Sequence, residues 1–153
     1  MYIRKFLNLI FVCICTFANV AALAKDYAAS CDNRGFLQAQ QNFENKSDYS
    51  KADVPVHICG TVLAISASRF TRSGKHGYFY LNIGSGVSIR IVSNLDEMHA
   101  PLWPWVKKGD YVEVAGRYYY DNPRRQGVDW THKGTSRKWP YPGYVKVHGI
   151  KYD

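Results

Sequence analysis

Three side chains in the second half of the sequence have the chemistry to transfer protons or bind a divalent metal. They are His76, Asp129 and His132, and His57 is a further candidate. Imidazole and carboxylate groups can act as acid, base or metal ligands at a phosphodiester. Asp129 and His132, however, lie three positions apart in an expected strand, where alternation places their side chains on opposite faces. We therefore treat catalysis as an alternative and expect neither a metal site nor a cofactor.

Two short basic stretches are better candidates for ligand binding. The chain has 20 Lys and Arg against 12 Asp and Glu, a formal charge of +8. Outside the N-terminal segment, part of this excess lies in two expected loops, Ser66–Gly77 and Asp121–Gly127. These loops contain Arg69, Arg72, Lys75, Arg124 and Arg125. A basic protein favours anionic partners, although short basic loops are often only solvated surface.

The hydrophobic pattern predicts an all-β fold with a small helical content. The chain is 46% hydrophobic, as in globular proteins. Alternating or β-branched segments predict five strands, which are Val54–Ser66, Tyr78–Ile83, Val87–Val92, Tyr111–Tyr120 and Val128–His132. A short helix is expected over Gly35–Glu44, capped by Ser30 or Asp32, and Tyr144–Val147 is a possible edge strand. Five strands with an irregular connector at Asn94–Val106 match a five-stranded OB-like Greek-key β-barrel.

OB barrels usually bind ligands across their second and third strands, between the first long loop and the loop joining strands four and five. We therefore expect the two basic loops to open onto a common mouth, forming a positively charged cleft with aromatic side chains. The expected binding residues are Arg69, Arg72, Lys75, His76, Tyr80, Tyr119, Arg124, Arg125, Trp130, Thr131 and His132. Most of the tyrosines and tryptophans are nevertheless expected to fill the barrel core or cover its ends, and for Tyr118 and Trp130 the core is the favoured interpretation.

The N-terminus has the pattern of a secretory signal peptide. Arg4 and Lys5 precede an apolar stretch over Phe6–Val20, and Ala22-Leu23-Ala24 supplies a small–x–small cleavage site. The apolar stretch is shorter than the roughly 20 residues that span a bilayer. We expect a signal peptide at 1–24, a helical and linker segment at 25–53 and the barrel domain at 54–153. The mature protein is then periplasmic or secreted, without an integral membrane segment.

Export determines how the cysteines are interpreted. Cys13 and Cys15 leave with the signal peptide, so that Cys31 and Cys59 remain. A pair of cysteines in an oxidising compartment predicts one disulfide, which would tie the N-terminal segment to the first strand. A redox-active pair is less favoured, because the spacing is unlike C-x-x-C.

Two stretches of the chain resemble a bacterial family known as domain of unknown function 3465. They are Lys108–Tyr118, with Gly-Asp-x-Val followed by Gly-x-Tyr, and Val128–His132, which contains Trp-Thr-His. His76 before Tyr78 and Phe79 adds to the resemblance, which covers roughly Val56 to Tyr152. It implies an OB-like fold and an exported protein, but no activity. Asp129 stands where the family pattern usually begins with His, and Trp139 falls near the place of a later His.

These observations predict an exported OB-fold binding module. Its expected ligand is an anionic polymer, such as single-stranded nucleic acid, or an oligosaccharide. One alternative is a metal-assisted nuclease or phosphodiesterase that uses His76, Asp129 and His132. Another is an interaction module that docks on an envelope protein.

Overall fold

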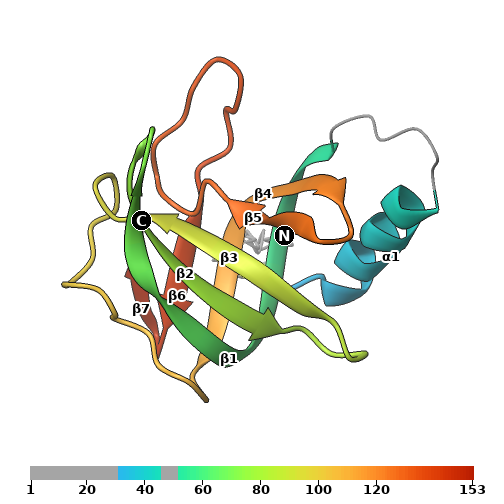
Figure 1. The fold of residues 1–153 in the computed structure, drawn as a ribbon, viewed down its shortest axis with the longest axis horizontal. Helices are drawn as coiled ribbons and strands as arrows, with labels where there is room; N and C mark the ends of the chain where they lie inside the picture. The colour runs from blue at the N-terminus through green and yellow to red at the C-terminus, as the bar shows by residue number, and fades with distance from the viewer. Residues whose placement is uncertain (1–30, 46–51) are drawn as a thin grey trace, which may run out of the picture.

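Five strands close into a ring in the computed structural model, which describes residues 31–45 and 52–153 (Figure 1). The strands of the ring are β1 (Ala52–Thr71), β2 (Gly74–Asn82), β3 (Ser88–Asn94), β5 (Arg125–Asp129) and β4 (Tyr111–Asn122). They pair in that order, and β4 returns to pair with β1. Only the β3–β5 contact in this ring is parallel. The mostly β architecture is confirmed, and the strand order is consistent with an OB-like barrel.

Alternate side chains of each strand fill the inside of the ring, as their period of two requires. In β4, Val112, Val114 and Tyr118 are fully buried, whereas Glu113 and Arg117 point outward. The other strands contribute a second set of fully buried side chains, which includes Ile58, Phe79, Leu81, Ile89, Ile91 and Val128. The prediction that Tyr118 belongs to the core is therefore confirmed.

The long strand β1 changes partner near Gly60. Its first half pairs with β4 from Ala52 to Thr61, and its second half pairs with β2 from Thr61 onward. At the change of partner the backbones approach so closely that a Cβ atom on Gly60 would lie 2.0 Å from the Asn82 carbonyl oxygen. A residue without a side chain is therefore required where the ring closes.

The one helix of the described residues, α1 (Asn33–Glu44), packs beside β1 and β4. Asp32 caps it by accepting a hydrogen bond from the Gly35 backbone N–H at 2.8 Å, as one of the two expected caps. Phe36 is buried, and its ring lies 4.7 Å from that of Tyr118 in an edge-to-face arrangement. The predicted disulfide joins Cys31, just before the helix, to Cys59 in β1.

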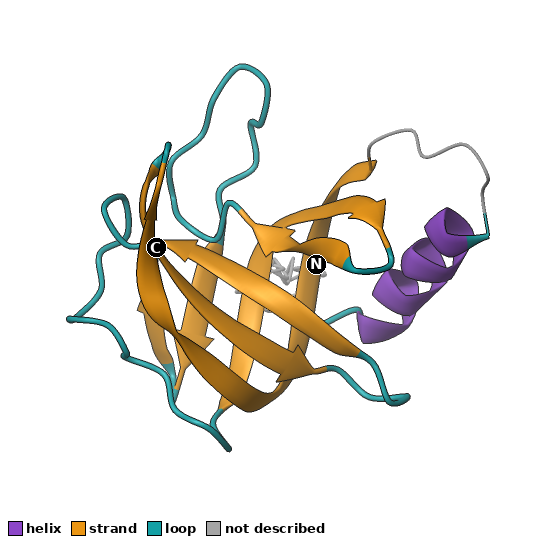
Figure 2. Cartoon of the chain, viewed as in Figure 1, coloured by secondary structure: helices purple, strands orange, loops and turns teal. Residues whose placement is uncertain are grey.

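Two further strands and a long loop complete the described chain. The edge strand β6 (Tyr144–Val147) pairs with β4, and β7 (Ile150–Tyr152) pairs with β6. The sequence did not predict β7, which has three residues and follows a turn in which His148 takes a positive φ of 50°. The loop of residues 130–143 connects β5 to β6 and rises above the ring (Figure 2). At its base, Gly143 N–H donates to the His132 carbonyl oxygen at 2.8 Å.

The two basic segments are hairpin turns rather than long loops, which corrects the sequence expectation. Strand β1 continues to Thr71 and β2 begins at Gly74, while β4 and β5 are joined through Pro123 and Arg124. Ser and Arg residues gave the first segment the composition of a loop, but these residues lie in an exposed hairpin. In Figure 1 the β1–β2 tip lies on the left, whereas the β4–β5 tip lies near α1.

One other expectation about the elements is corrected. The fifth strand ends at Asp129 instead of reaching His132, because Trp130 takes a φ of 51°, which extended backbone does not allow. The connector between β3 and β4 is irregular, as expected, and contains turns.

The described residues contain no helix that is long and apolar enough to cross a membrane. The expected signal peptide at 1–24 lies outside the described residues, as does most of the linker between α1 and β1.

We expect Gly60→Ala to destabilise the protein strongly, because the new methyl group would meet the backbone of β2. Overpacking of this kind typically costs about 1–3 kcal/mol of unfolding free energy. Urea unfolding followed by circular dichroism measures the change. Thr61→Ala, at an exposed neighbouring position, is the control and should change stability by less than about 0.5 kcal/mol. Equal stability of Gly60→Ala and the native protein would contradict the close approach.

Candidate ligand-binding face

The outward side of β2 and β3 carries a row of aromatic and cationic side chains. Phe79 and Leu81 point into the core, so Tyr78 and Tyr80 point outward, and on β3 the same alternation exposes Arg90 and Val92. The register pairs Tyr80 with Arg90 and Tyr78 with Val92. We call this surface the outer β2–β3 face. It runs between two depressions, one at each end of β3.

The first depression, which we call the His132 cleft, has a volume of about 230 Å³. It lies where β3 and β5 end and where the β1–β2 hairpin turns. Its lining consists of Ser73, His76, Val92, Asn94, Glu97, Arg117, Asp129, Trp130 and His132. The cleft therefore brings His76 close to Asp129 and His132, the three residues that we selected from the sequence as candidates for catalysis.

Asp129 is held by Arg117 from the neighbouring strand. The Arg117 Nε and one terminal nitrogen donate to the two Asp129 carboxylate oxygens at 2.8 and 2.7 Å. A second carboxylate, on Asp53, lies 3.4 Å from Arg117. The hydrogen bonds that Arg117 donates to Asp129 raise the pKa of Arg117, although burial opposes this. A carboxylate in such a bidentate pair is not free to act as a base.

Trp130 is positioned by its unusual backbone rather than by a strand. Its ring is stacked on the His132 imidazole, with centroids 5.3 Å apart and an angle of 27°. The Arg117 guanidinium carbon lies 6.0 Å from the centre of the same ring, at the limit of a cation–π contact. Because Trp130 is only partly buried, it presents an aromatic surface in the cleft.

His132 is 5% exposed, and its Nδ1 has no hydrogen-bond partner among the described residues. The Glu97 carboxylate lies 3.4 Å from this nitrogen, close enough for electrostatic attraction but without hydrogen-bond geometry. Burial lowers the pKa of His132, and the His76 imidazole adds to this effect, whereas Glu97 and Asp129 oppose it. The imidazole is therefore neutral at pH 7.

His76 enters the cleft from the other side. Its Nδ1 lies 2.9 Å from the Gly74 carbonyl oxygen and 3.1 Å from the Thr71 hydroxyl. Donation from Nδ1 to the carbonyl leaves Nε2 as the nitrogen that can contact a ligand. Over residues 31–45 and 52–153, no group of three His, Cys, Asp or Glu side chains is arranged to hold a metal ion. The three residues of the metal-assisted alternative thus share a cleft without forming a metal centre.

The second depression, which we call the Arg124 groove, lies at the opposite end of β3. It is lined by Tyr80, Ser88, Arg90, Pro123, Arg124 and Gln126. Arg90 donates to the Tyr119 hydroxyl from Nε at 3.0 Å and also from a terminal nitrogen. These bonds hold the guanidinium against the face.

The expectation of a common mouth for the two basic segments is wrong. Ser73, in the β1–β2 turn, lines a cleft with Asn94 at the end of β3, whereas Arg124 lines a groove with Ser88 at its start. The two tips are thus separated by the length of β3. They are nevertheless connected by the outer β2–β3 face, because both depressions include outward side chains of β3.

The remaining predicted binding residues differ in their positions. Arg72 and Arg125 are exposed in or beside the turns, and Arg69 is exposed in β1. Lys75 neighbours His76 in β2, so alternation directs it away from the cleft, and its Nζ lies 5.8 Å from the Phe70 ring. Thr131 is fully buried, and its hydroxyl bonds to the Val92 carbonyl oxygen and to Ser93 at 3.1 Å. Thr131 therefore supports the cleft and cannot contact a ligand.

Several residues of the face and its two depressions were not predicted from the sequence as binding residues, and they include Arg90, Asn94, Glu97 and Arg117. Arg90 and Asn94 alternate with buried residues on β3, so a count of every second residue would have placed them outward. Asn94 donates to the Glu97 carboxylate at 2.8 Å. No local pattern indicated the pairing of Arg117 with Asp129, which depends on the register of β4 and β5.

We expect the unfolding free energy to fall as the pH is lowered through about 6.5, the ordinary pKa of histidine. Because the folded pKa of His132 is lowered, the unfolded chain takes up its proton first, which favours unfolding by at most about 1.4 kcal/mol per pH unit. Urea unfolding at pH 7.5 and 5.5 tests this, and His132→Gln should weaken the dependence. The exposed His148→Gln is the control. Titration of the His132 ring by NMR at or above pH 6.5 would contradict the expectation.

Comparison with known proteins agrees with the sequence motifs. None of the curated proteins matches the chain. The model of a family described as "Protein of unknown function (DUF3465)" matches residues 16–153. Because this match covers nearly the whole chain, the protein belongs to that family of unknown function, as its Gly-Asp-x-Val and Trp-Thr-His motifs predicted.

Proposed function

We propose that the protein is an exported module that binds single-stranded nucleic acid along the outer β2–β3 face. The observation that carries this proposal is the pairing of Tyr80 with Arg90, beside Tyr78, in the centre of that face. An aromatic ring next to a guanidinium can stack on a base and attract a phosphate at the same time.

The depressions at the two ends of the face add further cationic and aromatic side chains. The Arg124 groove adds an exposed cation, and the His132 cleft adds the partly buried Trp130 ring and two imidazoles. A ligand that crosses both depressions follows β3 from Ser88 to Asn94, six steps of about 3.3 Å, or about 20 Å. This length suits a short single strand, and OB folds typically bind roughly 4–16 nucleotides.

Hydrolysis is less well supported than binding. Its proposed carboxylate, Asp129, is engaged by Arg117 through two hydrogen bonds. A neutral oligosaccharide could stack on the same tyrosines, but it would not use Arg90 and Arg124 as charges. Docking on an envelope protein would not require the aromatic and cationic row at all. The binding experiment below distinguishes these cases.

Export is proposed on two grounds. The first is the apolar N-terminal stretch with its Ala22-Leu23-Ala24 pattern. The second is the Cys31–Cys59 disulfide, which is typical of proteins in oxidising compartments. We therefore propose a periplasmic or secreted location.

We expect a fluorescently labelled oligothymidylate to bind the protein with an affinity that falls as salt rises. Tyr80→Ala should weaken binding about 5- to 150-fold, because stacking on one aromatic side chain is worth about 1–3 kcal/mol per base. Arg124→Ala should reduce the magnitude of the slope of log K against log salt by about 0.7, the value for one phosphate contact on a single strand. Fluorescence anisotropy measures both effects.

Two matched variants control this experiment. Tyr111→Ala removes an exposed tyrosine at the start of β4, and Lys107→Ala removes an exposed cation from the connector before it. Neither residue lines the outer β2–β3 face, so neither variant should change the affinity. Binding that is insensitive to Tyr80→Ala and Arg124→Ala would overturn the proposal. Salt-independent binding of a neutral oligosaccharide, with no oligothymidylate binding, would replace it.

We expect mass spectrometry of the protein recovered from a bacterial envelope or medium to show a chain that begins at Lys25. Cleavage after Ala24 removes residues 1–24 and leaves about 129 residues by the small–x–small rule. A chain in the cytoplasm that retains these residues would contradict the proposed export.

A further inference from the structure

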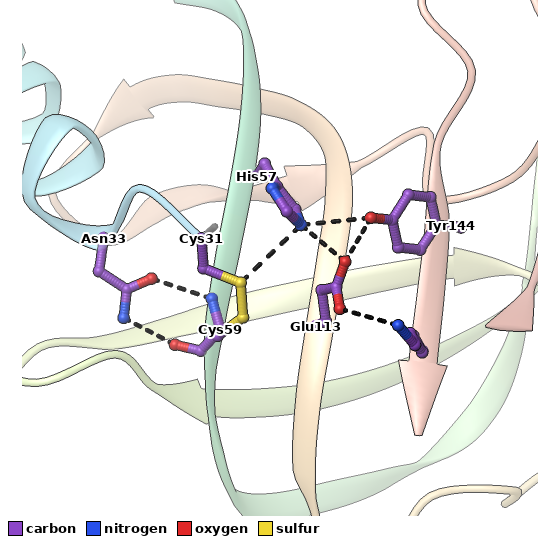
Figure 3. Close-up of polar contacts among 7 residues, drawn as sticks. Cys31, Asn33, His57, Cys59, Glu113 and Tyr144 are labelled. Atoms are coloured by element: carbon purple, nitrogen blue, oxygen red, sulfur yellow. Dashed lines mark hydrogen bonds and ion pairs between the residues drawn. A yellow bond between two sulfur atoms is a disulfide. The ribbon is translucent and has the colours of Figure 1, made fainter. Parts of the chain in front are cut away.

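A second polar cluster lies beside the disulfide, on a different part of the ring from the outer β2–β3 face. His57 in β1, Glu113 in β4 and Tyr144 in β6 point toward one another (Figure 3). The His57 Nε2 lies 2.9 Å from a Glu113 carboxylate oxygen and 3.2 Å from the Tyr144 hydroxyl. The Tyr144 hydroxyl donates to the same carboxylate oxygen. Neither the core nor the proposed nucleic-acid site requires this arrangement.

The cluster reaches the sulfur of Cys31. The Cys31 Sγ lies 3.8 Å from the His57 Nε2, within the range of a weak hydrogen bond to sulfur (Figure 3). On the far side of the cluster, the Lys146 ammonium lies 3.5 Å from the other Glu113 oxygen. Burial alone would raise the pKa of Glu113, but the bonds from Tyr144 and His57 and the charge of Lys146 outweigh it and lower the pKa. Glu113 is therefore ionised, and its carboxylate holds the His57 ring and the Tyr144 hydroxyl in place.

The two cysteine segments are also held together without the disulfide. The Asp32 N–H donates to the His57 carbonyl oxygen at 2.8 Å. The Asn33 side chain accepts from the Cys59 N–H at 2.9 Å and donates to the Cys59 carbonyl oxygen at 2.7 Å. Phe36, one turn into α1, is anchored in the core. Opening the sulfur–sulfur bond therefore leaves both cysteines in place, so the bond can close again.

The two cysteine residues differ in exposure. Cys59 is 8% exposed, whereas Cys31 is partly exposed and directly precedes the N-cap of α1. An anion near the start of a helix is stabilised by the helix dipole, and the N–H of a neighbouring imidazole can donate a hydrogen bond to a thiolate. Cys31 thus has the features of the attacking thiol of an exchange pair, and buried Cys59 has those of the resolving thiol.

We propose that Cys31 and Cys59 form a thiol–disulfide exchange site, in which His57 stabilises the Cys31 thiolate. In the reducing direction, a thiolate of a partner dithiol attacks the Cys31 sulfur, and Cys59 leaves and takes up a proton. The second thiolate of the partner then attacks its own sulfur in the mixed disulfide. Cys31 leaves as a thiolate beside His57, and the partner becomes a disulfide after giving up two electrons. The reverse sequence reduces a partner disulfide and restores the Cys31–Cys59 bond.

The first test measures the reduced protein, with Cys13→Ser and Cys15→Ser in the full chain so that only two thiols remain. The rate of Cys31 alkylation by iodoacetamide is followed against pH by mass spectrometry. We expect a midpoint at least one pH unit below the value of about 8.5 for a free cysteine. A midpoint near 8.5 would overturn the proposal, and this result does not depend on whether any His57 variant folds.

The second test uses His57→Gln in the same background, with His148→Gln as the matched control. His148 is paired with Asp110 and belongs to the β6–β7 turn. We expect His57→Gln to move the alkylation midpoint upward and to make the disulfide at least threefold harder to reduce in a glutathione buffer, while His148→Gln changes neither. Equal behaviour of the two variants would show that His57 does not stabilise the thiolate.

The third test separates exchange from a purely structural role. Circular dichroism of the reduced protein should show a folded chain at 25 °C, which reoxidises fully to the Cys31–Cys59 disulfide. A reduced chain that is unfolded would show that the bond only ties the N-terminal segment to β1, and the proposal would fall. Neither result bears on nucleic-acid binding, which is tested separately.

Discussion

The fold depends on one strand that pairs with two partners in turn. Because β1 pairs first with β4 and then with β2, the sheet closes on itself without a separate closing strand. The close approach at Gly60 permits this change of partner. Closure also determines which face of every strand is enclosed. Because successive side chains of a strand point to opposite faces, every second side chain then lies inside the ring and the others lie outside. The outward row on β2 and β3 is therefore a consequence of how the core is filled.

The alternation of apolar residues allowed the helix, four of the ring strands and the core position of Tyr118 to be predicted well. Polar hairpins were harder to predict, because an exposed strand such as Ser66–Thr71 has the residue composition of a loop. The end of β5 depended on the positive φ of Trp130, which no propensity of tryptophan indicates. Local rules describe buried periodic segments well, and they fail where solvent exposure or a single backbone angle decides the structure.

The candidate site shows a similar division. His76, Asp129 and His132 could be selected by residue type, and the structure does place them in one cleft. Their roles could not be predicted, because these depend on contacts between distant segments. Asp129 is paired with Arg117 across β4 and β5, and the Thr131 hydroxyl supports β3 from within. The positions of the two hairpin tips could not be predicted either, because they depend on how the strands pair in the closed ring and not on the residues of the tips.

The loop of residues 130–143 is fastened at its base. Thr131 is fixed to β3 through Val92, and the Gly143 N–H donates to the His132 carbonyl oxygen. A Cβ atom on Gly143 would lie 1.9 Å from the Trp130 carbonyl oxygen, so the two ends of the loop meet almost backbone to backbone. This contact therefore fixes the backbone on either side of the Trp130 and His132 rings. Changes of sequence at the exposed residues 135–138 leave the base of the loop intact, which gives this scaffold a place to diversify.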